Sequence, residues 1–280
     1  MTLTERKTPM NRRKRGLLAA VTTLTAGALV LGVPTAASAA SWNGWWWGGH
    51  GRWQPPVTAP TPDPTPVAET GETGSSAPAA SFVEDFNDSA ATGLVASAYR
   101  QAWQPYPDGT SGIYAPSQTV SVHDGVMDVR LGGAGTAGTF GTSAGAWDHV
   151  GGSFSVRAKA TGGDGNGAAF MLWPTSNVWS DGEIDFPEGN FDESPSAFHH
   201  SMVRGQEANR VQLGTGVSWR DWHTYKVDWV PGQSVTYSVD GRVLDTITHD
   251  VPTTAHRFMF QTGNWGQSGN LLIDWVTTTE

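Results

Sequence analysis

The chain of 280 residues contains no cysteine. It can therefore form no disulfide, no thiol nucleophile and no cysteine-ligated zinc site. Small secreted proteins often depend on disulfides, but about 200 residues can bury an adequate core without them. The absence excludes several classes of catalytic and metal site without arguing against a stable secreted domain.

Basic residues are also scarce, with 17 Lys and Arg against 26 Asp and Glu, for a formal charge of −9. Residues 1–39 hold six of the basic residues and one acidic residue, so the chain without them carries −14. An acidic surface repels nucleic acid and anionic lipid. We expect neither nucleic acid nor, after loss of residues 1–39, a membrane as partner, and we expect a monomer.

The first 80 residues do not look like part of a packed domain. Four basic residues, Arg12 to Arg15, precede an apolar run from Gly16 to Val33 and then small residues ending at Ala39. This order is typical of a secretory signal peptide over residues 1–39, so the protein is expected to be secreted and extracellular. Residues 40–80 hold a Trp/Gly-rich segment and a tract with seven prolines, and are predicted to be a disordered linker.

Residues 81–280 lack any long helical periodicity and instead contain short alternating runs between Gly, Asp and Asn turns. Asp124-Gly125 and Asp240-Gly241 are typical hairpin turns. Many short, evenly spaced strands predict an all-β sandwich or jelly roll of antiparallel sheets. The expected strands are 82–86, 119–122, 126–131, 153–159, 168–172, 183–186, 224–229, 235–239, 243–248, 257–262 and 270–277.

Three carboxylates lie within six residues of one expected strand: Glu183, Asp185 and Glu188. Because side chains alternate along a strand, Glu183 and Asp185 share a face, and regular alternation would turn Glu188 away from it. One extra residue, a β-bulge, would return Glu188 to that face, and Pro187 is tolerated at a bulge. Paired carboxylates are the groups that hydrolyse glycosidic bonds.

The segment 183–188 resembles the bulged catalytic signature, E-x-D-x-x-E, of glycoside hydrolase family 16. The segments 152–159, 167–174, 221–229, 239–241 and 272–276 also resemble family segments, in the family's order. The resemblance covers roughly residues 82–278. It implies a concanavalin-like β-jelly roll and a retaining endo-β-glycanase that needs no cofactor for catalysis.

The resemblance also implies roles for the three carboxylates. Glu183 would be the nucleophile, Glu188 the general acid and then base, and Asp185 the residue that tunes the pair. Electrostatics agrees, because close carboxylates cannot all ionise cheaply, so the cluster should retain a proton at neutral pH. The bulged signature occurs in laminarinase-like, agarase-like and carrageenase-like members. A glucanase is favoured because the acidic chain shows no basic run for a sulfated polymer, and β-1,3-glucan is the expected substrate.

Other residues are expected to contact the polysaccharide or a metal. Tryptophans near the signature suit the apolar faces of sugars, and family members place a histidine on the following strand, where we favour His199 over its neighbour. Arg157 could reach the cleft or hold a buried carboxylate. The substrate-contact candidates are Trp173, Trp179, His199, Trp265 and Arg157. The resemblance further implies a structural Ca²⁺ ion, with Asp274 and the Gly125 carbonyl as ligands.

Other functions on this fold remain open at this point. A transglycosylase shares the chemistry up to the covalent intermediate, and a galactan hydrolase shares the signature. A non-catalytic carbohydrate-binding relative would usually lack one of the two glutamates, and both are present. A jelly-roll polysaccharide lyase would need a basic, tyrosine-bearing cleft in place of paired carboxylates.

Overall fold

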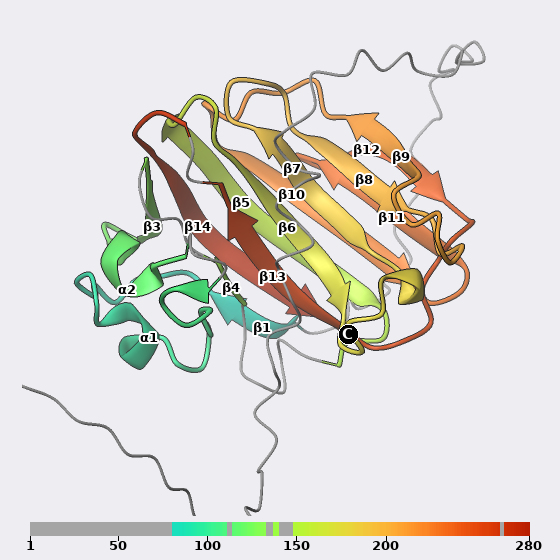
Figure 1. Cartoon of the computed structure of the whole chain (residues 1–280), viewed down its shortest axis with the longest axis horizontal. Helices are drawn as coiled ribbons and strands as arrows, with labels where there is room; N and C mark the ends of the chain where they lie inside the picture. The colour runs from blue at the N-terminus through green and yellow to red at the C-terminus, as the bar shows by residue number, and fades with distance from the viewer. Residues whose placement is uncertain (1–79, 111–113, 133–136, 140–147, 264–265) are drawn as a thin grey trace, which may run out of the picture. The chain divides into compact units, whose positions relative to one another are not determined.

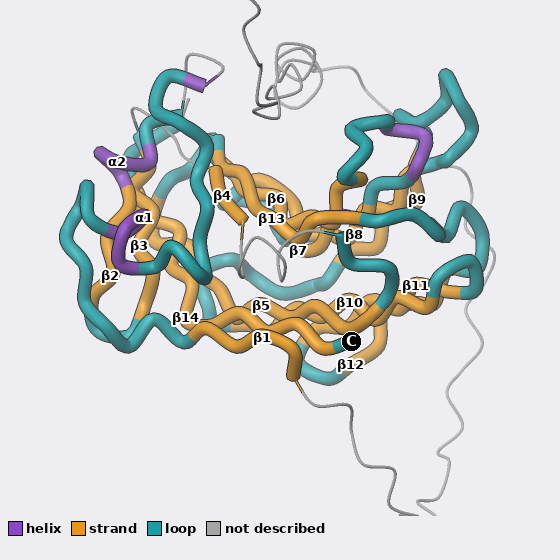
Figure 2. Tube along the Cα trace, turned by 90° about the horizontal axis from the view of Figure 1, so that it is seen from below, coloured by secondary structure: helices purple, strands orange, loops and turns teal. Residues whose placement is uncertain are grey.

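A computed structural model describes residues 80–280, apart from 111–113, 133–136, 140–147 and 264–265. These residues form two antiparallel β-sheets that lie one above the other as two layers (Figures 1 and 2). The expected all-β sandwich is confirmed. The predicted signal peptide and the predicted linker up to residue 79 lie outside the described residues, and residue 80, expected to end the linker, begins a strand.

The eight-stranded sheet has the order β12-β11-β10-β5-β14-β3-β2, and β1 also pairs with β14. Its strands are β1 (Ala80–Glu84), β2 (Val120–His123), β3 (Val126–Leu131), β5 (Gly152–Gly162), β10 (His223–Val230), β11 (Ser234–Val239), β12 (Arg242–Ile247) and β14 (Gly269–Thr279).

The six-stranded sheet has the order β4-β13-β6-β7-β8-β9. Its strands are β4 (Ala137–Thr139), β6 (Gly167–Pro174), β7 (Ile184–Asn190), β8 (Ser196–His200), β9 (Arg210–Gly214) and β13 (His256–Thr262). In the described part of the chain, short helices accompany the sheets: α1 (Val95–Ala98), α2 (Pro116–Thr119) and the 3₁₀ turn η3 (Trp179–Asp181). None of the helices that the structure describes is long and apolar enough to cross a membrane.

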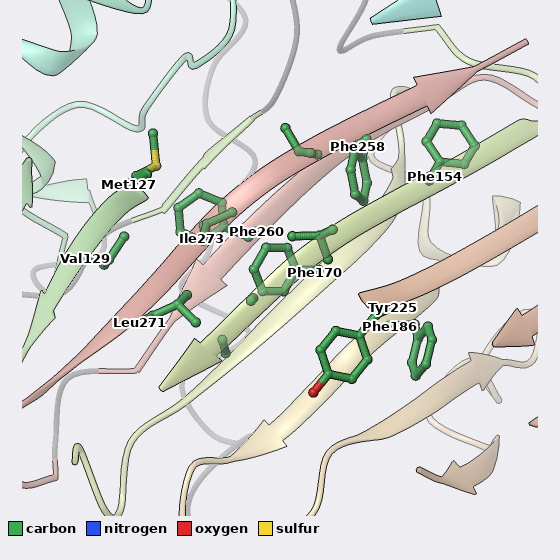
Figure 3. Close-up of a cluster of buried hydrophobic side chains, with 14 of the residues drawn as sticks. Met127, Val129, Phe154, Phe170, Phe186, Tyr225, Phe258, Phe260, Leu271 and Ile273 are labelled. Carbon is green, nitrogen blue, oxygen red and sulfur yellow. The ribbon is translucent and has the colours of Figure 1, made fainter. Parts of the chain in front are cut away.

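The core fills the space between the two sheets (Figure 3). Phe154 of β5 packs against Phe258 of β13 with ring centroids 5.4 Å apart, and Phe186 of β7 meets Tyr225 of β10 edge-on at 5.4 Å. Alternate residues of each strand point into this layer, as expected for sheets that bury one face on each other. The residues between them point outward, and on the six-stranded sheet they form the candidate site.

Eleven of the strands follow the expected runs, with ends that differ by a few residues. Both predicted hairpin turns are confirmed, since Asp124, Gly125, Asp240 and Gly241 all have positive φ, as a type I′ turn requires. Two strands, β4 and β9, were not predicted as runs. Strand β8 was expected only from the family resemblance.

Candidate active site

The predicted β-bulge is present in β7, where the carboxylates lie. Across β6, two residue steps from Ala169 to Met171 span three steps of β7, from Glu188 to Asp185. The same mismatch occurs against β8 on the other side. The extra residue lies between Asp185 and Glu188, next to Pro187, and restores Glu188 to the face that Asp185 occupies.

This face of the six-stranded sheet points away from the core between the sheets, and we call it the site face. Ala169, Met171 and Trp173 of β6 form a cluster there that is separate from the main core. Asp185 is opposite Met171 and Glu188 is opposite Ala169, so both carboxylates share this side. Ile184 and Phe186 point into the main core.

Glu183 lies one residue before β7 and is held by three contacts. Its Oε2 accepts a hydrogen bond from Trp179 Nε1 at 2.5 Å, and the same oxygen lies 3.7 Å from His200 Nδ1. Its backbone carbonyl accepts from the His200 amide at 3.2 Å. The carboxylate therefore has a fixed direction on the site face.

All three carboxylates are buried, with exposed fractions of 2% for Glu183, 0% for Asp185 and 6% for Glu188. Burial, followed by the charge of Asp185, raises the pKa of Glu188 well above its ordinary value. The same two causes raise the pKa of Glu183, but His200 and the Trp179 N–H oppose them. These two contacts therefore favour the ionised form of Glu183.

His200 supplies a positive charge next to the carboxylates. Its Nε2 lies 3.2 Å from Asp185 Oδ2, and its Nδ1 lies 2.9 Å from the Glu207 carbonyl. Burial alone would lower the pKa of this ring, but the contacts with Asp185 and Glu183 raise it to about 9. The imidazolium can thus stabilise the Asp185 carboxylate and favour the ionised form of Glu183.

The expectation that His199 faces the site was wrong. His199 points between the sheets, where Nδ1 lies 2.9 Å from Tyr237 Oη and Nε2 lies 3.0 Å from the carbonyls of His249 and Asp250. Adjacent residues of β8 alternate, so only one of the two rings can meet the carboxylates. The polar partners of His199 lie on the inner side of the sheet, so His199 faces inward and His200 faces the carboxylates.

Two of the predicted tryptophans lie beside the carboxylates. Trp179 contacts Glu183 directly, and Trp173 is on the site face with Nε1 3.1 Å from Asn177 Oδ1. Tyr106, from the segment between α1 and α2, packs on the same cluster. Trp265 lies outside the described residues.

Arg157 is not part of the site face. It lies on β5 of the other sheet, where its guanidinium binds the Asp274 carboxylate and covers the Trp222 ring at 4.9 Å from the centroid. The interpretation that Arg157 contacts substrate was therefore wrong, and the carboxylate that it holds is partly exposed where the alternative expected a buried one. Alternation explains this placement, since Phe154, Val156 and Ala158 of β5 point inward.

The same ion pair bears on the predicted Ca²⁺ site at Asp274 and Gly125. A Ca²⁺ ion requires several oxygen ligands, and Asp274 was the carboxylate among the predicted ligands. That carboxylate is already neutralised by a guanidinium, so these residues do not fit a bound cation. Among the described residues, the group of side chains able to hold a metal is Glu183, Asp185 and His200, whose ligand atoms lie within 4.8 Å of one another.

Several residues of the site carry no signal in a local sequence pattern. Arg210 of β9 lies over the Phe198 ring, 4.1 Å from its centroid, and its charge lowers the pKa of both glutamates against the effect of burial. On the other side Met259 of β13 is opposite Met171. These residues reach the site because strands from distant segments pair with one another. A local sequence motif contains no information about such pairing.

The model of the family described as glycosyl hydrolases family 16 matches residues 115–277. The chain belongs to glycosyl hydrolase family 16. A β-glucanase of Bacillus subtilis (strain 168) is 28% identical over 128 residues, which are 45% of this chain and 50% of that protein. The chain thus spans about half the length of the curated relative that it matches.

Solved structures of family 16 enzymes share the fold. SCLam, a non-specific endo-β-1,3(4)-glucanase, matches with a TM-score of 0.57 at 17% identity, over 72% of this chain and 91% of its own. LamAcat from Zobellia galactanivorans gives 0.55 at 16% identity, over 72% and 97%. The Bacillus licheniformis β-glucanase gives 0.53 at 20% identity, over 72% and 99%. At these identities the likeness establishes the fold.

Proposed function

We propose that the chain is a secreted endo-β-glucanase that hydrolyses β-1,3-linked glucan with retention of configuration. The observation that carries the proposal is the bulge in β7, which brings Asp185 and Glu188 to one face beside a fixed Glu183. Relatives named as β-glucanase and endo-β-1,3(4)-glucanase support the substrate class.

In the first step Glu183 attacks the anomeric carbon while Glu188 donates its proton to the departing glycosidic oxygen. The surroundings fit these roles, because His200 and the Trp179 N–H favour ionised Glu183, whereas burial and the charge of Asp185 favour protonated Glu188. The products of this step are a covalent glycosyl-enzyme and a glucan with a new hydroxyl group.

In the second step Glu188, now a carboxylate, removes a proton from water, which attacks the same carbon and releases Glu183. His200 and Asp185 stabilise the changing charges without exchanging atoms with the sugar. The partly exposed rings of Trp179 and Tyr106, packed on the Trp173 and Met259 side chains, offer an apolar surface for the C–H faces of glucose units.

The test uses the secreted protein on laminarin, lichenan, agarose and xyloglucan, with release of reducing ends as the readout. We expect the highest rate on laminarin. Glu183→Ala should be inactive but form an α-glycosyl azide with added azide, whereas Glu188→Ala should form a β-azide from an activated aryl glycoside. Azides of the same anomeric form from both variants would refute the roles, and products longer than the substrate would indicate a transglycosylase.

A further inference from the structure

The residue before the nucleophile has a backbone conformation that only glycine adopts readily. Gly182 has φ 116° and ψ 153°. A Cβ atom at this position would lie 2.4 Å from Pro252 Cγ, well inside contact distance. Such a conformation persists only where the surroundings fix it, and it sets the direction in which Glu183 leaves the turn.

A fully buried histidine from a distant segment contacts this glycine. His256, at the start of β13, has an exposed fraction of 0%, and its Nε2 lies 3.1 Å from the Gly182 carbonyl oxygen. Its Nδ1 lies 2.9 Å from the Thr254 carbonyl oxygen. The ring packs edge-on against Trp229 at 5.0 Å, and Trp229 Nε1 donates to the Pro252 carbonyl at 3.0 Å.

Two carbonyls thus face one ring, and a neutral imidazole has a single N–H to donate. Burial lowers the pKa of His256, which favours the neutral form. The proton therefore serves either Gly182 or Thr254. The Thr254 carbonyl belongs to the same short segment as the ring, whereas the Gly182 carbonyl joins two segments that are more than 70 residues apart in the chain.

We propose that His256 is a positioning residue for the reaction, donating from Nε2 to the Gly182 carbonyl and so fixing the Glu183 carboxylate. It completes a hold from three sides, with Trp179 Nε1 on the Glu183 side chain and the His200 amide on the Glu183 carbonyl. The inference rests on the proposed role of Glu183 as nucleophile. His256 itself touches neither sugar nor reacting atoms.

A matched pair of amides separates the two ring nitrogens. In His256→Gln the side-chain amide can reach the position of Nε2, and in His256→Asn the position of Nδ1. We expect kcat/KM of the Gln variant to stay within about 3-fold of wild type and that of the Asn variant to fall by ~10- to 100-fold, mainly in kcat, as for a misplaced reacting group. His199→Gln is the control, since it alters a buried histidine that does not contact the carboxylates.

The decisive arm removes the carboxylate that is being positioned. In Glu183→Ala with azide, the external anion replaces the nucleophile, so adding His256→Asn should change the rescued rate by less than about 3-fold. An equal loss in both backgrounds would overturn the proposal, because His256 would then act on the fold as a whole. Equal rates for the Gln and Asn variants would overturn it as well.

Two outcomes keep the inference separate from the proposed function. If azide fails to rescue Glu183→Ala alone, the nucleophile assignment fails and the inference fails with it. If rescue succeeds and only the His256 arms fail, the assignment stands and the positioning role is wrong. Should the Asn variant not fold, His256→Met, which has similar volume and no donor, takes its place.

Discussion

Replacing Glu183 by glutamine should stabilise the protein at neutral pH while abolishing its activity. Glu183 is only 2% exposed, and its burial and the charge of Asp185 raise its pKa from 4.5 to about 8. The folded state therefore binds this proton more tightly than the unfolded state does. The stability that the proton provides is fully present below the unfolded pKa and is lost as pH rises toward the folded pKa.

The size of the effect follows from the distance between those two pKa values. At pH 7 the group has passed about 2.5 units beyond its unfolded pKa, and each unit is worth 1.36 kcal/mol, which gives an upper figure of about 3 kcal/mol. We expect the stability of the glutamine variant relative to wild type to be about 1–3 kcal/mol greater at pH 7 than at pH 4. This corresponds to roughly 2–12 °C in Tm for a domain of this size.

The assay is thermal unfolding of wild type and Glu183→Gln in matched buffers from pH 4 to pH 8. The difference in Tm between the two proteins should grow with pH. Taking this difference removes the contributions of groups that titrate alike in both proteins. Glu193→Gln, at an exposed carboxyl, should show no such growth. A difference that is constant across the range, or one in which the glutamine variant becomes less stable as pH rises, would refute the reasoning.

Three further predictions concern the surrounding residues. Asp185→Asn removes a charge that raises the pKa of Glu188, so the basic limb of kcat/KM against pH should move to lower pH, and an unmoved limb would contradict the coupling. Trp179→Phe removes the N–H that stabilises ionised Glu183, so the acid limb should rise by about one pH unit with KM nearly unchanged. Calcium and a chelator should leave the Tm of wild type unchanged, because Arg157 already neutralises Asp274, and a Tm raised by calcium would show that the ion pair does not exclude the ion.

Local patterns were enough to predict the parts of the fold that depend on neighbours in the chain. Alternating runs bounded by turn residues located most strands, and the Asp-Gly pairs located two hairpins because they require positive φ. The bulge was predictable because three carboxylates with a proline between them fit one face only if the strand gains a residue. The three proposed catalytic residues follow from that segment alone.

Features set by distant partners could not be predicted in this way. In β8 the sequence shows two adjacent histidines, but Tyr237 and the carbonyls near Asp250 decide which one is buried between the sheets. Phe198, the large apolar residue of β8, points to the site face, where Arg210 covers it. Strand β9 was missed because its site-face residues are polar or glycine and only Val211 and Leu213 pack on the core.

Arg157 illustrates the same limit. Alternation places it on the outer face of its strand, but the sequence does not say to which sheet that strand belongs. Because β5 lies in the sheet opposite the carboxylates, Arg157 meets Asp274 and never the site. His256 is similar, since its contact with Gly182 depends on β13 returning beside the turn that precedes β7.

The stereochemistry of the first product tests the proposed double displacement most directly. Hydrolysis of a short β-1,3-glucan followed by proton NMR from the first seconds should show the β-anomer of the new reducing end before mutarotation adds the α-anomer. That order requires a glycosyl-enzyme on Glu183 and water activated by Glu188. Initial release of the α-anomer would mean a single displacement by water, and would contradict the assignment of Glu183 as a nucleophile.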